Sequence, residues 1–418
     1  MKGVRMLTVA SLLLCAFGAS AQPFVGDAVL SDVLASRNTE IQAAAPAVAM
    51  ARDRLGVAIA WTMHDGASQD VYVARLDSGG RIVAPVTAIG TPQTVNAYWP
   101  SIAVSPAGTG FTLVWTERLR VFLPQSVSVV YSQLDADLKP SAPRLLTTLG
   151  AANVTTPAIV RSGRSTWISA GGVVWEIRAD GSRGAVLDAG APVTDMVAIA
   201  DYPQVVSGQN TNTGWACLPK PGCSAPGPPF NGFCYLHCRV DQFAYEVRFV
   251  SLYSGSAVRR FSFKSDSGAA IQGNGRDLLL AWFNGEPGAG GPVTAVRLDA
   301  TSFDLVERDL DTGRDIGTFG PEVNATRPDI AADDERYVVV WSTRTSRGDR
   351  DVVGASIDRA GHITSFPIAT SAAGENDPSI LKTSSGNFLV AYELSSGEND
   401  RRIATRFLKF NGRRRAVH

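Results

Sequence analysis

Four cysteine side chains lie close together in the second half of the chain and are the residues best suited to chemistry. They are Cys217, Cys223, Cys234 and Cys238, separated by five, ten and three residues. In an exported protein, four clustered cysteines predict two disulfides, and three pairings are open. A zinc site that includes His237 is the alternative, but these spacings do not match the usual pairs of zinc ligands. We therefore expect disulfides to hold the segment 217–238, which has few apolar residues of its own.

A second candidate is a run of alternating carboxylates at Asp309, Asp311 and Asp315. Calcium takes several oxygen ligands from a tight loop, so this run could supply three of them. The glutamate expected at the twelfth position of a calcium loop is replaced by Gly320, and Arg314 adds a positive charge inside the run. We expect a solvated loop, with calcium as the alternative and no other cofactor.

Residues for nucleophilic or acid–base catalysis are sparse. The sequence contains neither a Gly-x-Ser-x-Gly motif nor a glycine-rich phosphate loop, and its four histidines occupy non-equivalent turns, loops or tails. Carboxylates from different parts of the chain could still meet at one axis, as a glycosidase requires. The question of an enzyme therefore stays open, and the sequence favours a role without catalysis.

The elements that must position these residues are internal repeats. Each repeat begins with Pro or an equivalent, a small residue and Ile or Val, continues through an apolar stretch to Trp or Tyr, and ends in a polar turn. Pro328, Trp341 and Asp358 mark these points in one repeat. A period of 46 to 66 residues with four strand-like segments indicates a β-propeller. The repeats begin near residues 46, 100, 157, 203, 269, 328 and 378.

The predicted fold is all-β, a seven-bladed propeller with four-stranded antiparallel blades spanning residues 22–418. Strand A starts at the proline, strand B is buried on both faces, strand C alternates, and strand D is the outer edge. The chain ends soon after the last C–D turn, so we expect the N-terminal segment 28–36 to complete the last blade. Six blades with an inserted subdomain are the alternative, because the repeats at 157 and 203 are irregular. The repeated tryptophans are expected to pack between neighbouring sheets.

The cysteine segment falls between strands B and C of the fourth repeat. In an up-and-down blade, the B–C turns share a face with the D–A connections. Asn96, Asn153 and Asn324 each lie four residues before a repeat proline and belong to this face. They could form a polar, ligand-binding ring around the channel mouth, but we favour asparagines that cap turns.

The first residues predict export. Lys2 and Arg5 precede a short apolar run, and cleavage after Ala21 would leave a mature chain from Gln22. The run is too short for a membrane span. With 39 basic and 39 acidic residues, the net charge is zero, which gives no reason to expect nucleic acid as a partner. We expect a secreted or periplasmic protein, monomeric, with an unknown protein or glycan ligand.

The repeat resembles those of secreted bacterial β-propellers. Ser105-Pro106-Ala107-Gly108 resembles the turn of TolB-type repeats, although it lacks their usual Asp. Sialidases share the general architecture, but their Ser-x-Asp-x-Gly box is missing from the C–D turns. The resemblance implies the fold and no particular activity.

Two functions fit these observations best, and a purely structural envelope protein with no small ligand is a third possibility. The first is an exported scaffold that binds a ligand or a protein through the face carrying the B–C and D–A loops. The second is an extracellular hydrolase or lyase acting on glycans at the channel mouth. An enzyme should place two or more carboxylates in a concave axial pocket, whereas a scaffold should line it with Asn, Ser and Gly.

Overall fold

The structure is a computed structural model that describes residues 22–34, 48–64, 69–89, 95–119, 126–150, 156–199, 202–207, 215–219, 235–240, 244–251, 257–264, 269–283, 293–300, 318–319, 328–397 and 400–410. Throughout these ranges the regular elements are β-strands, as predicted. No helix in the described part of the chain is long and apolar enough to cross a membrane.

Most strands belong to antiparallel sheets of four, each running from an inner to an outer strand. The strands of these six sheets are β3 (Val48–Arg52), β4 (Val57–His64), β5 (Gln69–Leu76) and β6 (Ile82–Ala88); β7 (Val95–Val104), β8 (Phe111–Leu119), β9 (Ser126–Leu134) and β10 (Arg144–Gly150); β11 (Ala158–Ser162), β12 (Ser165–Ala170), β13 (Val173–Arg178) and β14 (Arg183–Asp188); β15 (Val193–Ile199), β16 (Tyr202–Ser207), β19 (Ala244–Ser251) and β20 (Ala257–Lys264); β21 (Ala269–Gly273), β22 (Asp277–Phe283), β23 (Val293–Asp299) and β24 (Thr318–Phe319); β25 (Asp329–Ala332), β26 (Arg336–Arg344), β27 (Arg350–Asp358) and β28 (Ile363–Ala369).

Two further sheets complete the described strands. A five-stranded closing sheet contains β1 (Phe24–Val25), β2 (Val29–Leu34), β29 (Gly374–Lys382), β30 (Phe388–Gly397) and β31 (Asp400–Lys409). A two-stranded hairpin contains β17 (Trp215–Pro219) and β18 (Tyr235–Val240).

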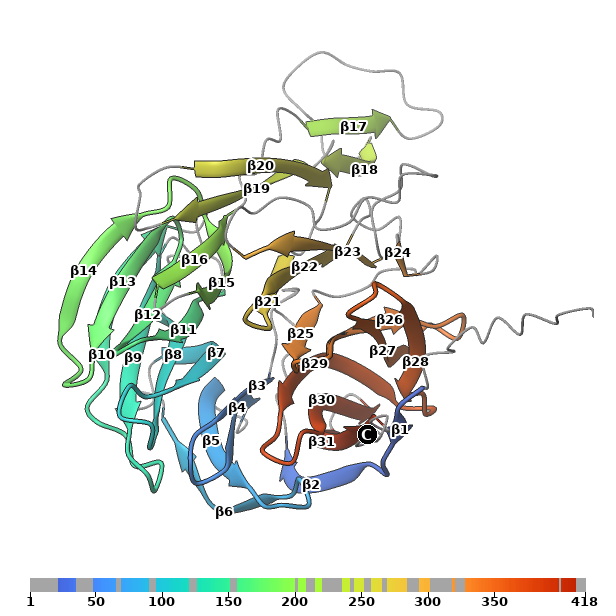
Figure 1. The fold of residues 1–418 in the computed structure, drawn as a ribbon, viewed down its shortest axis with the longest axis horizontal. Coiled ribbons are helices and arrows are strands. Elements are labelled where there is room, and N and C mark those ends of the chain that lie inside the picture. Colours follow the sequence, from blue (N-terminus) through green and yellow to red (C-terminus); the bar gives the residue numbers. More distant parts are fainter. Residues whose placement is uncertain are drawn as a thin grey trace, which may run out of the picture.

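The sheets stand around a common axis, as Figure 1 shows. Their inner strands contact one another in sequence, from β3 through β7, β11, β15, β21 and β25 to β29, and β29 contacts β3 again. This circular order of contacts defines a β-propeller. The fold class predicted from the repeats is therefore confirmed.

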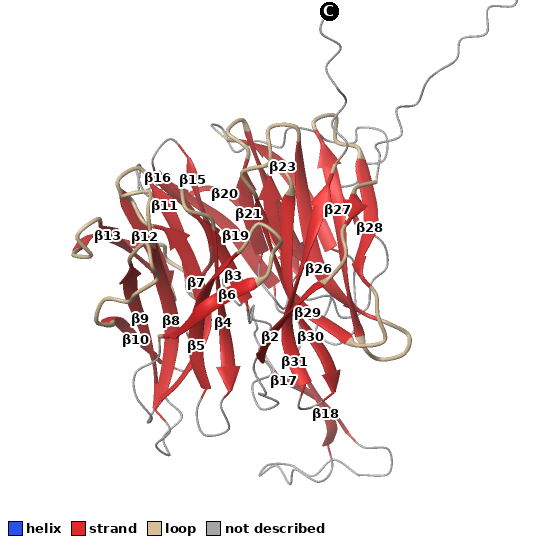
Figure 2. Ribbon diagram, turned by 90° about the horizontal axis from the view of Figure 1, so that it is seen from below, coloured by secondary structure: helices blue, strands red, loops and turns tan. Residues whose placement is uncertain are grey.

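The sequence predicted a ring of seven four-stranded blades, and the number of four-stranded sheets in the structure differs from this. Six sheets are four-stranded, which agrees with the alternative of six blades and an insertion. The ring is completed by the closing sheet, which has five strands because β31 pairs with β30 on one side and with both N-terminal strands on the other. The insertion is the hairpin β17–β18, which extends from the lower end of the molecule in Figure 2.

The fourth repeat begins earlier than predicted. Its inner strand is β15, and Pro203 lies in the second strand, β16. Proline fits the start of any strand, so the Pro-x-Val pattern does not by itself mark an inner strand. Trp215 likewise begins the inserted hairpin and does not end strand B. The hairpin lies between the second and third strands of its sheet, β16 and β19.

The N-terminal segment closes the ring, as the sequence predicted. Val29 lies opposite Thr405 in the register of β2 with β31, and Phe24 lies opposite Lys409 in that of β1. Figure 1 shows these blue strands beside the red C-terminal ones. Pairing the two ends of the chain covers a sheet edge that would otherwise expose its backbone donors and acceptors.

The core consists of apolar layers between adjacent sheets. Trp61, Trp115 and Trp341 are fully or almost fully buried at corresponding places in their second strands. Trp341, for example, belongs to a cluster that includes Phe283 of the preceding sheet. The tryptophans therefore pack between sheets, as expected, and do not form a carbohydrate-stacking surface.

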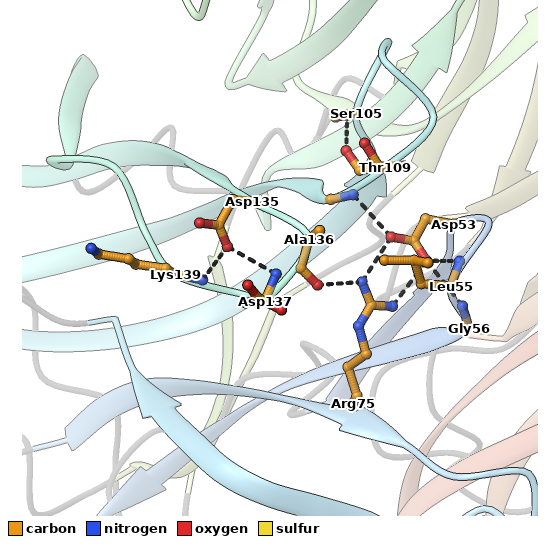
Figure 3. Close-up of polar contacts among 11 residues, drawn as sticks. Asp53, Leu55, Gly56, Arg75, Ser105, Thr109, Asp135, Ala136, Asp137 and Lys139 are labelled. Atoms are coloured by element: carbon orange, nitrogen blue, oxygen red, sulfur yellow. Dashed lines mark hydrogen bonds and ion pairs between the residues drawn. The ribbon is translucent and has the colours of Figure 1, made fainter.

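Polar contacts between neighbouring A–B and C–D turns join the sheets at the face opposite the B–C and D–A connections. The Asp53 carboxylate pairs with the guanidinium of Arg75 at 2.8 and 2.9 Å, and it accepts the backbone amide of Gly110 in the next sheet at 2.9 Å. Arg75 donates onward to the carbonyl of Ala136 at 2.9 Å. Figure 3 shows this group of contacts, which joins two sheets through one buried carboxylate.

Candidate functional site: the axial cavity

A cavity of about 160 Å³ lies at the centre of the ring. Residues at or just before the starts of inner strands contribute most of its wall. Inner strands begin at the face that carries the D–A and B–C connections, so the cavity lies toward the face expected for recognition. Its lining residues are Val48, Ala49, Met50, Ser101, Ile102, Thr156, Pro157, Ala158, Ile159, Asp195, Pro328, Asp329, Asp377, Pro378 and Ser379.

The polar part of this wall is acidic. Asp195, Asp329 and Asp377 contribute three carboxylates, and no lysine, arginine or histidine is among the lining residues. The three aspartates come from different sheets, on β15, β25 and β29. Positions up to 182 residues apart in the sequence thus face one cavity, which is why no local motif revealed them.

Two of these carboxylates act as ties between sheets. Asp329 accepts the amide of Ile330 at 2.8 Å through Oδ1 and the amide of Ile380 in the next sheet at 2.9 Å through Oδ2. Asp195 repeats this geometry with Met196 and Ile271, both at 2.9 Å. Each oxygen of both residues therefore already accepts a backbone donor, which offsets the cost of placing two half-buried carboxylates at the cavity wall.

The same position in other repeats shows that the ties are part of the fold. Ser101 follows its repeat proline as Asp329 does, and its hydroxyl donates to the carbonyl of Pro157 in the next sheet at 2.7 Å. Ala158 and Ala270 occupy the position elsewhere and make no such side-chain bond. The position thus accepts small residues or those that bridge to the next inner strand.

Asp377 differs from the other two aspartates. Its carboxylate has no hydrogen-bond partner among the described residues, and Arg350 and Arg401 act on it only through their charge. Burial raises the pKa of Asp377 to about 6, and the two arginines oppose that rise only in part. Asp377 therefore differs from Asp195 and Asp329, because its carboxylate at the cavity wall accepts no hydrogen bond from the described residues.

The backbone at Asp377 explains how its side chain reaches this place. A β-bulge interrupts the pairing of β29 with β30 between Asn376 and Ser379, and Asp377 has a positive φ of 47° immediately before Pro378. Trp99, which precedes a proline in another bulged inner strand, has a φ of 57°. The conformation therefore occurs in two inner strands, β7 and β29, and at β29 the residue that adopts it carries a carboxylate.

A buried carboxylate outside the cavity wall, that of Glu393, lies opposite Asn376, the residue before Asp377. Glu393 on β30 is 4% exposed, and its Oε1 accepts from Nη1 of Arg401 at 3.2 Å. Burial raises the pKa of Glu393 to about 7; Arg401 opposes this rise, and the charge of Asp377 adds to it. Protonation of Glu393 and of Asp377 is therefore linked, because each charge disfavours the other.

The asparagines predicted to form a ring are not brought together by the described residues. Asn96 lies inside β7, opposite Arg118 of β8, and has partners of its own, while Asn153 and Asn324 lie outside the described residues. The predicted calcium residues Asp309, Asp311 and Asp315 also lie outside them. No group of three or more potential metal ligands occurs in the described part of the chain.

The cysteine segment is described only in part. Cys217 and Cys238 lie directly opposite each other in the register of β17 with β18, while Cys223 and Cys234 are outside the described residues. The aspartates of the axial cavity were missed by sequence reasoning. Comparing the residue after each repeat proline would have singled out Asp329, but Asp195 follows Thr194, and Asp377 precedes its proline.

Comparisons with known proteins do not assign this chain to a family. No family model and no curated protein matches the chain. The propeller domain of the Trilobed protease from Pyrococcus furiosus is 11% identical, with 87% of this chain and 97% of that chain covered and a TM-score of 0.43. The NanB sialidase from Streptococcus pneumoniae is 8% identical, with 91% of this chain and 70% of that chain covered and a TM-score of 0.44. The S. cerevisiae core factor is 9% identical with a TM-score of 0.47; 97% of this chain is covered, but only 64% of the core factor chain.

Proposed function

We propose that the protein is an exported β-propeller that acts as a binding scaffold, and that its axial cavity receives a positively charged group of a ligand or protein partner. The observation that carries this proposal is Asp377, a carboxylate without a described hydrogen-bond partner in a cavity whose wall has no basic side chain. A carboxylate in such a site pairs strongly with an ammonium or guanidinium group.

The size of the cavity restricts what can enter. Small-molecule sites commonly measure about 300–1,000 Å³, whereas this cavity measures about 160 Å³. It therefore suits one charged head group and not a whole polysaccharide. A lysine or arginine side chain of a partner, or a small amine, has the matching chemistry.

Binding to small amines tests this proposal directly. Arginine and lysine would be titrated into the protein by calorimetry, with citrulline and norleucine as neutral counterparts. We expect the cationic compounds to bind, and Asp377→Asn to weaken their binding by about tenfold or more, since a hydrogen bond to a charged group contributes about 1.5–3 kcal/mol. Asparagine tolerates the left-handed backbone and keeps the shape of the side chain.

Asp334→Asn is the matched control, because its side chain is 84% exposed and lies in an A–B turn on the opposite face. It should leave binding unchanged. Equal binding of neutral and cationic compounds, or unchanged binding in Asp377→Asn, would contradict the proposal. Affinity should rise as the pH increases through about 6, where Asp377 becomes ionised.

The second candidate function is hydrolysis or elimination on a glycan, and the linked pair Asp377 and Glu393 favours it, since raised pKa values are typical of catalytic acids. Two open carboxylates flanking a sugar are needed for glycoside hydrolysis. In the cavity, Asp195 and Asp329 already accept backbone amides through both oxygens. The three carboxylates of the cavity meet the criterion that the sequence analysis set for an enzyme, but of these three only Asp377 has oxygens that accept no described backbone amide. We therefore rank hydrolysis second; release of reducing sugar from a glycan panel, lost in Asp377→Asn, would reverse this order.

Export is tested separately. Residues 1–21 lie outside the described residues, and the described structure begins at Gln22. N-terminal sequencing of protein recovered outside the cytoplasm should begin at Gln22. An intact Met1 in the recovered protein would contradict the export part of the proposal.

A further inference from the structure

The register of the inserted hairpin places two cysteine positions face to face. Strands β17 and β18 are antiparallel, with Ala216 opposite Arg239 and Cys217 opposite Cys238. Directly opposed residues in an antiparallel pair have Cα atoms about 4.5–5.5 Å apart. Disulfides join Cα atoms about 4.4–6.8 Å apart, so this register meets the geometric requirement at the backbone.

The same register disfavours the other pairings. Tyr235 lies opposite Pro219, three positions along β18 from Cys238. At about 3.3 Å per residue, that end of the strand is about 10 Å from the point opposite Cys217. Cys234 adjoins Tyr235, so a bond from Cys217 to Cys234 would require the strands to shift. A bond from Cys234 to Cys238 would have to run along one extended strand.

We propose that Cys217 and Cys238 form a cross-strand disulfide, and that Cys223 and Cys234 form the second one, which it encloses. Each bond forms when two thiols lose two protons and two electrons to a disulfide oxidant, which is itself reduced to two thiols. The inference uses only the export part of the proposed function, since an oxidising compartment lets such bonds persist.

The proposed bond has a consequence for the recognition face. A two-stranded hairpin is at best marginally stable in water, and β17–β18 pairs with no other described sheet. Closing the segment between Cys217 and Cys238 restricts its unfolded states and thereby favours the paired hairpin. The bond would hold the hairpin in shape beside the B–C and D–A connections.

Counting unpaired thiols in double variants distinguishes the three pairings. The purified protein, carrying Cys15→Ser, would be equilibrated with oxidised glutathione, alkylated and weighed by intact mass spectrometry; glutathione adducts count as unpaired thiols. We expect none in this protein and none in the variant Cys217→Ser with Cys238→Ser. We expect two in the matched control Cys217→Ser with Cys223→Ser, which breaks both proposed bonds. This in vitro oxidation succeeds or fails independently of export.

Two unpaired thiols in the first variant overturn the proposal: none in the control would then indicate Cys217–Cys223 with Cys234–Cys238, and two in the control would indicate Cys217–Cys234 with Cys223–Cys238. Four unpaired thiols without either substitution would also overturn it. Fragmentation of unreduced peptides from the protein with all four cysteines provides a second measurement that needs no substitution in the hairpin. A link from Cys217 to Cys238 is expected, and a link from Cys217 to Cys223 or Cys234 would contradict it.

Discussion

Asp329 on one inner strand accepts the backbone amide of Ile380 on the next, at 2.9 Å. This bond joins the first strands of neighbouring sheets near the axis. Asp195 and Ile271 form the corresponding bond between β15 and β21, two sheets earlier in the ring. The carboxylates nearest the axis therefore connect the ring as well as define its cavity.

The first prediction concerns this connection. Asp329→Ala should lower the free energy of unfolding by about 1–3 kcal/mol, because two backbone amides lose their acceptor. The loss should not prevent folding, since Ala158 and Ala270 occupy the same repeat position elsewhere. Urea denaturation of the variant measures it. A variant as stable as the parent would show that water replaces the carboxylate at no cost.

The second prediction concerns the ion pair of Asp53 with Arg75. Burial raises the pKa of Asp53, but the hydrogen bonds from Arg75 and from the amides of Gly110 and Leu55 outweigh it and leave the pKa lowered. Asp53→Ala should cost about 3–5 kcal/mol in urea denaturation, since it leaves a guanidinium and several amides without their acceptor. The exposed Asp334→Ala should change stability by less than about 0.5 kcal/mol.

The same carboxylate should contribute to acid denaturation. A lowered pKa means that the stabilisation by Asp53 is present above the unfolded value, about 3.9, and is lost as the pH falls through the folded value. The free energy of unfolding of Asp53→Asn should therefore be lower than that of the parent protein at neutral pH, and the two values should approach each other below about pH 3. A difference that stays constant from pH 7 to pH 2 would contradict this account.

The third prediction uses two glycines with similar backbones. Gly110 has a φ of 73°, and an added Cβ would lie 2.2 Å from the carbonyl oxygen of Leu134. Gly386 has a φ of 79° and open space around it. Gly386→Ala should cost about 1–2 kcal/mol from the backbone alone, and Gly110→Ala roughly 2–5 kcal/mol because a clash is added. Equal losses of stability would show that the turn moves to accommodate the methyl group.

The fourth prediction concerns Glu393, whose pKa is raised to about 7 chiefly by burial. For an acid with a raised pKa, the stabilising contribution is present below the unfolded value and is lost as the pH rises through the folded value. The stability of the parent relative to Glu393→Gln should therefore fall by roughly 3 kcal/mol between about pH 4 and pH 8. Denaturation curves at five or six pH values measure this difference.

A flat difference across that range would mean that Glu393 stays ionised beside Arg401. Asp377→Asn is the informative companion variant, because the charge of Asp377 adds to the raised pKa of Glu393. Removing that charge should move the midpoint of the pH dependence of Glu393 to lower pH. No movement would show that the two carboxylates titrate independently.

Most of the local structure could be predicted from the sequence because its causes are local. Asp and Asn in the turns bind nearby amides, as Asp333 does with those of Glu335 and Arg336, and such residues can be recognised in any repeat. The apolar runs that end in Trp341 or Trp115 became buried strands because a strand covered on both faces needs continuous apolar residues. The closure by the N-terminal segment followed from an incomplete last repeat.

The start of the fourth repeat and the axial cavity were decided by tertiary structure. Pro203 looked like the start of an inner strand, but only pairing could show that β15 precedes it at the centre of the ring. Asp195, Asp329 and Asp377 share no local spacing, and they meet because separate inner strands converge on one axis. The pattern of apolar residues along the chain indicates which side chains each strand buries. Which distant side chains share a cavity is determined by the closing of the ring.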